Sequence, residues 1–139
     1  MANTIHVDIV SAEGQIFSGE ATRVFAPGSQ GELGIYPRHA PLLTTLAAGE
    51  VRVQTEGQEE QSFFVGGGAM EIQPHLVTVL ADTAVRAKDL DEAAALAAKQ
   101  RAEDAVRNRS DKLDIAEAQA ELLRALAQLR VIARLRKKN

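Results

Sequence analysis

Glycine and proline are confined to the first part of this 139-residue chain, and their confinement restricts the possible folds more than any other feature. All ten glycines lie at or before Gly68, and all four prolines lie at or before Pro74. Turn-forming residues therefore punctuate the first part, whereas residues 89–139 are rich in alanine and contain neither helix breaker. This contrast predicts a β-rich unit over residues 1–88 and a helical unit over residues 89–139.

Short apolar runs predict eight strands in the first unit. In residues 5–9, apolar residues alternate with His6 and Asp8, as is typical of a strand with one buried face. The other expected strands cover residues 15–18, 22–26, 42–46, 51–55, 61–65, 69–72 and 76–81. Such close spacing favours antiparallel pairing, because parallel neighbours need a crossover of a dozen or more residues. We therefore expect an antiparallel β-sandwich or barrel.

Two helices are expected in the second unit. Asp89 followed by Glu92 has the spacing of a capping box and predicts a first helix over about residues 91–107. The same spacing recurs at the start of a second helix, expected over about residues 114–137. A polar break at residues 108–111 separates the two. The predicted fold class is therefore α+β, a β-sandwich followed by an antiparallel helical hairpin.

Apolar residues of the second helix recur every three or four positions and predict a stripe that packs against the first helix. The large members of this stripe are Ile115, Leu122, Leu129 and Ile132. The facing residues of the first helix are expected to be alanines, namely Ala94, Ala97, Ala98 and Ala105. Because alanine buries little apolar area, the hairpin is expected to be easily detached.

The segment of residues 31–43 carries the most unusual group of polar side chains. Its candidate site residues are Glu32, Tyr36, Pro37, Arg38 and His39. Pro37 and Pro41 restrict the backbone, so we expect a stiff loop that presents these side chains for docking. An ordinary structural turn is one alternative. An acid/base pair of Glu32 and His39 is another, although neither a nucleophile nor a second carboxylate accompanies it.

Other kinds of site are disfavoured by the composition. The chain has no cysteine, which excludes disulfides, thiolate metal sites and cysteine nucleophiles. Residues 66–68 are three glycines, but the lysine and hydroxyl residue of a phosphate-binding loop do not follow. The three histidines lack metal-site spacing. We therefore expect no metal and no cofactor.

The last eighteen residues carry six basic side chains and no acidic one, although the whole chain has a net charge of −3. Cations near a helix C-terminus are favoured by the helix dipole, so a solvated helix end is one interpretation. A surface that meets an acidic partner is the other. Nucleic acid is a less favoured partner, because aromatic residues are not interleaved with the basic ones.

Several segments together resemble the epsilon subunit of bacterial F-type ATP synthases. They are residues 31–43, 64–68, 73–84, 89–93 and 127–132. The resemblance extends over essentially the whole chain, in order. It implies a sandwich of about ten strands followed by a helical hairpin.

The resemblance also implies a function. Members of this family are non-catalytic subunits of the central stalk that couple the gamma subunit to the c-ring during proton-driven ATP synthesis. Their hairpin can extend toward the alpha and beta subunits and inhibit ATP hydrolysis. By resemblance, residues 32 and 36–39 form the c-ring contact, and the inhibitory contact is made by Arg124, Arg130, Arg134 and Arg136.

Some relatives bind ATP in the folded hairpin. Here Asp91 and Arg101 match that motif, but Ala94 stands where an arginine is expected, so we predict weak or absent nucleotide binding. The N-terminus lacks the pattern of a signal or transit peptide. We therefore expect a peripheral protein at the cytoplasmic face of the bacterial inner membrane, held there only through the complex. A free-standing adaptor, with a β-sandwich and a basic partner-binding helix, is the alternative.

Overall fold

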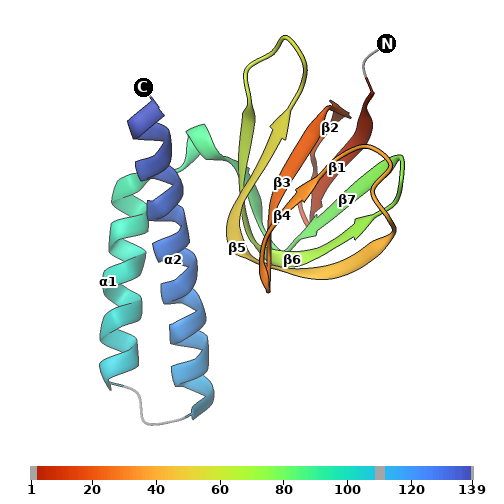
Figure 1. The fold of residues 1–139 in the computed structure, drawn as a ribbon. Helices are drawn as coiled ribbons and strands as arrows, with labels where there is room; N and C mark the ends of the chain where they lie inside the picture. The colour runs from red at the N-terminus through yellow and green to blue at the C-terminus, as the bar shows by residue number, and fades with distance from the viewer. Residues whose placement is uncertain (1–2, 109–111, 139) are drawn as a thin grey trace. The chain divides into compact units, whose positions relative to one another are not determined.

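The chain consists of a β-sheet unit followed by two helices (Figure 1). The structure, a computed structural model, describes residues 3–108 and 112–138. Its two compact units are Met1–Ala87 and Lys88–Asn139. The predicted α+β class, a β-sandwich followed by a helical hairpin, is confirmed.

Eight strands form the sheet within the described residues. They are β1 (Ile5–Ser11), β2 (Gly14–Ala21), β3 (Arg23–Gly28), β4 (Gly31–Ile35), β5 (Leu42–Gln54), β6 (Gln61–Ile72), β7 (Leu76–Ala81) and β8 (Ala84–Arg86). Their order is β2-β1-β7-β6-β5-β3-β4, and β8 also pairs with β6. Strands β2 and β4 therefore lie at the edges of the sheet.

One pair of strands differs from the antiparallel prediction. Strands β1 and β7 are parallel, with Val7 opposite Val77 and Ile9 opposite Val79. The other pairs are antiparallel. A crossover helix is not needed, because five strands lie between β1 and β7 in sequence and supply the connection.

The predicted and observed strands agree in number but not in identity. Strand β5 joins two predicted strands into one, and β6 joins two others. Strands β4 and β8 were not predicted. Strand β6 pairs with β8 over residues 63–65 and with β7 over residues 68–72, so two parts of one long strand pair with different strands. Figure 1 shows β5 and β6 as the long, curved strands of the unit. This explains why eight strands suffice where the resemblance implied about ten.

Inward-facing residues of these strands build one hydrophobic core. Alternate residues of β1 (Ile5, Val7 and Ile9) are fully buried, as the period-two pattern predicts. Within this core, the bulkiest side chains from β6 are Phe63 and Met70. Among the described residues, the buried set contains no polar or charged side chain.

The helices begin at other residues than predicted. A short 3-10 helix (Ala87–Asp89) precedes α1 (Glu92–Asn108), and α2 spans Lys112–Lys138. Asp91 caps α1, because its Oδ1 accepts a hydrogen bond from the Ala94 amide at 3.2 Å. The expected cap at Asp89 is therefore wrong, because the observed cap, Asp91, lies two residues later. Of the predicted break, residue 108 belongs to α1 and residues 109–111 lie outside the described residues.

Candidate functional site

The loop between β4 and β5, residues 36–41, is held in one shape by its own backbone, and we call it the Tyr36 loop. The His39 amide donates to the Tyr36 carbonyl at 3.2 Å and closes a turn around Pro37. The Arg38 amide donates to the Pro74 carbonyl at 2.9 Å and ties the loop to the turn before β7. Arg38 has a φ of 68°, which is uncommon for a residue with a side chain.

The loop presents several of the predicted site residues. Tyr36 is 52% exposed and the Arg38 side chain is exposed, whereas Pro37 and His39 are half-buried. His39 Nδ1 donates to the Ala40 carbonyl at 2.6 Å, which fixes the orientation of the ring. The structure thus contains a turn at the expected place, with Tyr36 and Arg38 exposed on it.

Glu32 does not belong to this loop. It lies in β4 opposite Pro27, and its carboxylate pairs with the Arg52 guanidinium of β5. Arg52 also lies over the Phe25 ring, 4.5 Å from its centroid. Because Glu32 pairs with Arg52 and His39 with Ala40, the structure does not join them as an acid/base pair.

Two leucines beside the loop were missed as candidate site residues. Leu42 and Leu43 begin β5, and they are 40% and 73% exposed. Their sequence did contain a signal, since adjacent residues of a strand point to opposite faces and one of two neighbouring leucines must face outward.

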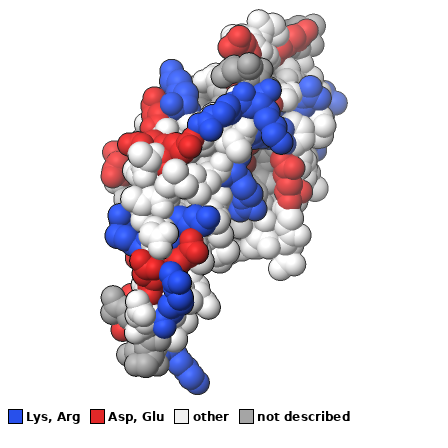
Figure 2. Space-filling view, turned by 90° about the vertical axis from the view of Figure 1, so that its left-hand side faces the viewer, with Lys and Arg blue, Asp and Glu red and all other residues white. Residues whose placement is uncertain are grey.

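The predicted basic residues lie along the second half of α2. Arg124, Arg130 and Arg136 are exposed, and Arg134 is half-buried. Arg136 pairs with Glu92 at the start of α1, which brings opposite ends of the two helices together. On the face of the hairpin seen in Figure 2, acidic and basic side chains are interspersed.

The predicted hairpin stripe is half-buried at Ile115, Leu122, Leu129 and Ile132, with buried Ala118 and Ala125 between them. Arg136 follows Ile132 by four residues and contacts α1, which supports a stripe that faces α1. On α1, however, Ala95 and Ala102 are buried, whereas of the predicted alanines Ala98 and Ala105 are half-buried and Ala94 and Ala97 are exposed. The expected alanine face is therefore wrong by one residue, because in a run of alanines every helical phase looks alike.

The two candidate nucleotide residues are far apart on α1. The Asp91 carboxylate caps the helix, and exposed Arg101 lies ten residues further along. At about 1.5 Å per residue, this separation is roughly 15 Å. The arrangement gives no additional support to nucleotide binding.

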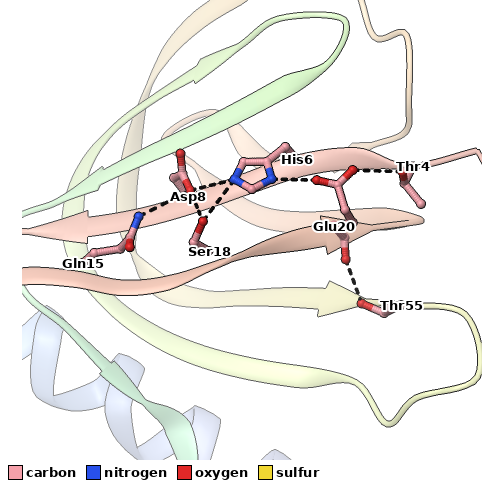
Figure 3. Close-up of polar contacts among 7 residues, drawn as sticks. All are labelled: Thr4, His6, Asp8, Gln15, Ser18, Glu20 and Thr55. Carbon is pink, nitrogen blue, oxygen red and sulfur yellow. Dashed lines mark hydrogen bonds and ion pairs between the residues drawn. The ribbon is translucent and has the colours of Figure 1, made fainter.

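A polar cluster on β1 and β2 was also missed, and we call it the His6 cluster. It consists of His6, Asp8, Ser18 and Glu20 (Figure 3). His6 Nδ1 lies 2.6 Å from Glu20 Oε2, while Nε2 lies 3.0 Å from Asp8 Oδ1 and 3.1 Å from Ser18 Oγ. Thr4 and Gln15 extend the cluster at its two ends. From the sequence, His6 was expected only to face solvent.

The environment of His6 favours its charged form. The hydrogen bond with Glu20, assisted by Asp8, raises the pKa of His6, and partial desolvation opposes this rise. The hydrogen bonds from His6 and Thr4 lower the pKa of Glu20. Both ring nitrogens face a carboxylate, and only imidazolium can donate to both.

Ser18, His6 and Glu20 are spaced like a nucleophile, base and orienting acid, but their hydrogen bonds do not suit catalysis. The Ser18 hydroxyl donates to Asp8 Oδ1 at 2.7 Å, and not to the histidine. Imidazolium cannot accept a proton from serine. The cluster is thus better suited to holding β1 and β2 together than to activating Ser18.

Other kinds of site gain no structural support among the described residues. The glycines of residues 66–68 lie inside β6, where they form neither a loop nor a helix start. Within residues 3–108 and 112–138, no cluster of three histidine, aspartate or glutamate side chains is arranged to hold a metal ion. Neither α1 nor α2, as far as they are described, is long and apolar enough to span a membrane.

Comparison with known proteins identifies both units. Residues 4–87 match the β-sandwich domain of the ATP synthase Delta/Epsilon chain, and residues 88–133 match the long alpha-helix domain of the same family. The ATP synthase epsilon chain of Nitrosococcus oceani is 63% identical over 138 residues, which cover 99% of each chain. The ATP synthase epsilon chain 1 of Methylococcus capsulatus is 61% identical over 137 residues, covering 99% of this chain and 98% of the relative.

A solved structure has the same fold at low sequence identity. A chain of the Euglena gracilis mitochondrial ATP synthase superposes with a TM-score of 0.84 at 17% identity, covering 94% of this chain and 82% of that one. On the evidence of both family matches and of relatives over 60% identical, the chain belongs to the epsilon chains of the F-type ATP synthase family.

Proposed function

We propose that this chain is a non-catalytic subunit of the central stalk, which couples the gamma subunit to the c-ring during proton-driven ATP synthesis. The Tyr36 loop is the observation that carries this proposal. Its backbone hydrogen bonds fix the loop, while Tyr36 and the neighbouring Leu43 remain exposed. A fixed loop loses little conformational entropy on binding, and its exposed apolar groups gain free energy when they are covered.

The c-ring is the proposed partner of this loop. The contact would involve Tyr36, Pro37, Arg38 and His39, with Leu43 as an added apolar member. Glu32 would join the contact from β4, because its side chain is 57% exposed although it pairs with Arg52. The outer strands of the sandwich would then be held by the gamma subunit.

The hairpin is the proposed brake on ATP hydrolysis. In the folded hairpin Arg136 pairs with Glu92, and both side chains are substantially exposed. An exposed pair is worth only about 0–1 kcal/mol, so an acidic segment of the alpha or beta subunits can replace Glu92 at little cost. Arg124, Arg130 and Arg134 would extend the same contact along α2. The chain would work at the cytoplasmic face of the bacterial inner membrane, without entering the bilayer.

Reconstitution tests the docking half of the proposal. The full chain and a Tyr36→Ala, Leu43→Ala variant are added to ATP synthase stripped of this subunit, and the bound fraction and proton-driven ATP synthesis are measured. Burying two large apolar side chains is worth about 1.5–3 kcal/mol each, so the variant should bind at least tenfold more weakly.

The matched control is Leu96→Ala, Leu123→Ala on the hairpin, where the side chains are 49% and 63% exposed. This variant should bind the stripped complex as the unchanged chain does. Equal binding by the loop variant would refute the docking role of the loop. If the unchanged chain does not bind at all, a free-standing adaptor is the better interpretation.

A further inference from the structure

We propose that the His6 cluster is a pH-sensitive clasp, which fastens the edge strand β2 to β1 while the His6 ring carries its second proton and loosens once that proton is lost. This proposal does not depend on the assembly partners of the chain. It rests on the geometry of four side chains from two neighbouring strands.

Strand β2 has a particular need for such a clasp. It lies at one end of the strand order, so within the described residues it pairs with β1 alone. Their ladder is interrupted between Ile9 and Val10, where the register shifts. His6 pairs with Glu20 in register and Asp8 pairs with Ser18, so the cluster bridges the strands beyond this irregularity. Thr55 adds a contact from outside the pair, as its hydroxyl donates to the Glu20 carbonyl at 3.0 Å.

Among the described residues, the charged groups paired with His6 are the two carboxylates already named. Asp8 comes from β1 itself and Glu20 from β2. On its other side β1 pairs with β7, whose residues Leu76–Ala81 include no ionisable side chain. His75, just before β7, meets His6 through its backbone carbonyl, which accepts from the His6 amide at 3.0 Å.

Loss of the His6 proton changes both the hydrogen bonds and the charge of the cluster. Neutral imidazole has one N–H group, so it can donate to Asp8 or to Glu20 but not to both. The cluster also changes from one net negative charge to two, and its carboxylates then repel each other without a cation between them. Deprotonation therefore removes either the hydrogen bond from His6 to Glu20, which crosses the strands, or the one from His6 to Asp8, which orients the ring.

The direction of the pH effect follows from linkage. The pKa of His6 is raised above its ordinary 6.5, so the stabilisation is complete below pH 6.5 and is lost as the pH rises through the folded-state pKa. The pKa of Glu20 is lowered from 4.5. The stabilisation that Glu20 contributes is therefore complete above pH 4.5 and is lost as the pH falls through the folded-state pKa. The clasp is thus fully closed between these two titrations.

NMR titration of the full chain tests the proposal directly. The His6 ring signals, assigned by comparison with a His6→Gln variant, should titrate above pH 6.5, and a Glu20→Gln substitution should move that titration downward. Amide exchange at β2, corrected for the intrinsic pH dependence, should lose protection as His6 deprotonates. Titration of His6 at or below 6.5 would overturn the proposal, even if every variant failed to fold.

Unfolding by urea supplies the second measurement. Each unit of pKa difference between folded and unfolded His6 corresponds to up to tenfold in the unfolding equilibrium constant. We expect the advantage of the unchanged chain over His6→Gln to shrink between pH 6 and pH 9, because the pKa of His6 is raised in the folded state. The control, His75→Gln, replaces an exposed histidine outside the cluster and should keep the pH dependence of the unchanged chain. An advantage over His6→Gln that does not change with pH would contradict a clasp.

Discussion

At the scale of single residues, Arg38 combines backbone strain with exposure. Its φ of 68° lies in the left-handed region, where a side chain costs about 1–2 kcal/mol. The hydrogen bond from its amide to the Pro74 carbonyl keeps the residue there. The surrounding structure thus holds an exposed residue in a strained conformation. We infer that the Arg38 side chain serves contact rather than stability.

Two substitutions at this position separate strain from side-chain contact. Arg38→Gly relieves the strained backbone but adds freedom to the unfolded chain, whereas Arg38→Ala keeps the strain. We expect Arg38→Gly to be more stable than Arg38→Ala by about 0.5–1 kcal/mol in urea unfolding. Both should weaken docking to the stripped complex to a similar degree, since both remove the guanidinium. Equal stability of the two variants would mean that the loop does not hold Arg38 in the left-handed region.

Sequence reasoning at this scale succeeded where the backbone was constrained. The prolines of the Tyr36 loop predicted a stiff turn, and hydrogen bonds do fix that loop. Glu32 was misplaced because its position depends on Arg52, twenty residues away on another strand. The His6 cluster was missed for a similar reason, since the register between β1 and β2 is needed to bring Glu20 beside His6.

At the scale of elements, strand β6 pairs first with β8 and then with β7, and the sandwich depends on this change of partner. Gly68 stands at the start of its pairing with β7, opposite Ala81, with a φ of +140°. A Cβ atom there would overlap the Leu80 carbonyl oxygen and lie 2.9 Å from Ala81 Cα. The glycine is thus required by the close approach of β7.

Replacement of this glycine should therefore be severe. Gly68→Ala combines a clash with the backbone of β7 and a backbone conformation unfavourable to alanine, so we expect a loss of at least about 2–3 kcal/mol in the free energy of unfolding. Gly57→Ala is the control, because Gly57 also has a positive φ, +77°, but no atom lies within 4 Å of the added Cβ. That variant should lose only about 1 kcal/mol. Similar losses for both would show that β7 does not approach Gly68 closely.

The strand prediction failed where a strand continues through glycine residues. Glycine normally separates strands, so residues 66–68 divided β6 in the sequence although the chain continues in one strand. Strand β4 was taken for loop because residues 31–35 contain two glycines, and because the alternation of Leu33 and Ile35 is too short to indicate a strand. The helices were predicted more accurately, because their periodicity is local; the errors were in their first residues and in the phase of the alanine-rich α1.

At the scale of the whole molecule, the proposed function assigns different tasks to the two units. The sandwich has its own hydrophobic core and the proposed docking loop. The hairpin has small buried side chains, notably Ala95, Ala102, Ala118 and Ala125, and carries the basic end of α2. Because alanines bury little apolar area, separation of the helices from each other is comparatively inexpensive. This difference suits a fixed dock joined to a movable brake.

The most direct test of this account is ATP hydrolysis by a catalytic head stripped of this subunit, measured over a concentration series of added protein. The additions are the full chain, residues 1–88, a variant with Arg124, Arg130, Arg134 and Arg136 changed to Gln, and a control with Lys99, Arg101, Arg107 and Lys112 changed to Gln. Four ion pairs with the catalytic head at about 0.2–1 kcal/mol each predict at least about fourfold weaker inhibition for the first variant. The control should inhibit as the full chain does, and residues 1–88 should bind without inhibiting. Inhibition by residues 1–88 alone, or undiminished inhibition by the variant that lacks the four arginines, would contradict the assignment of dock and brake.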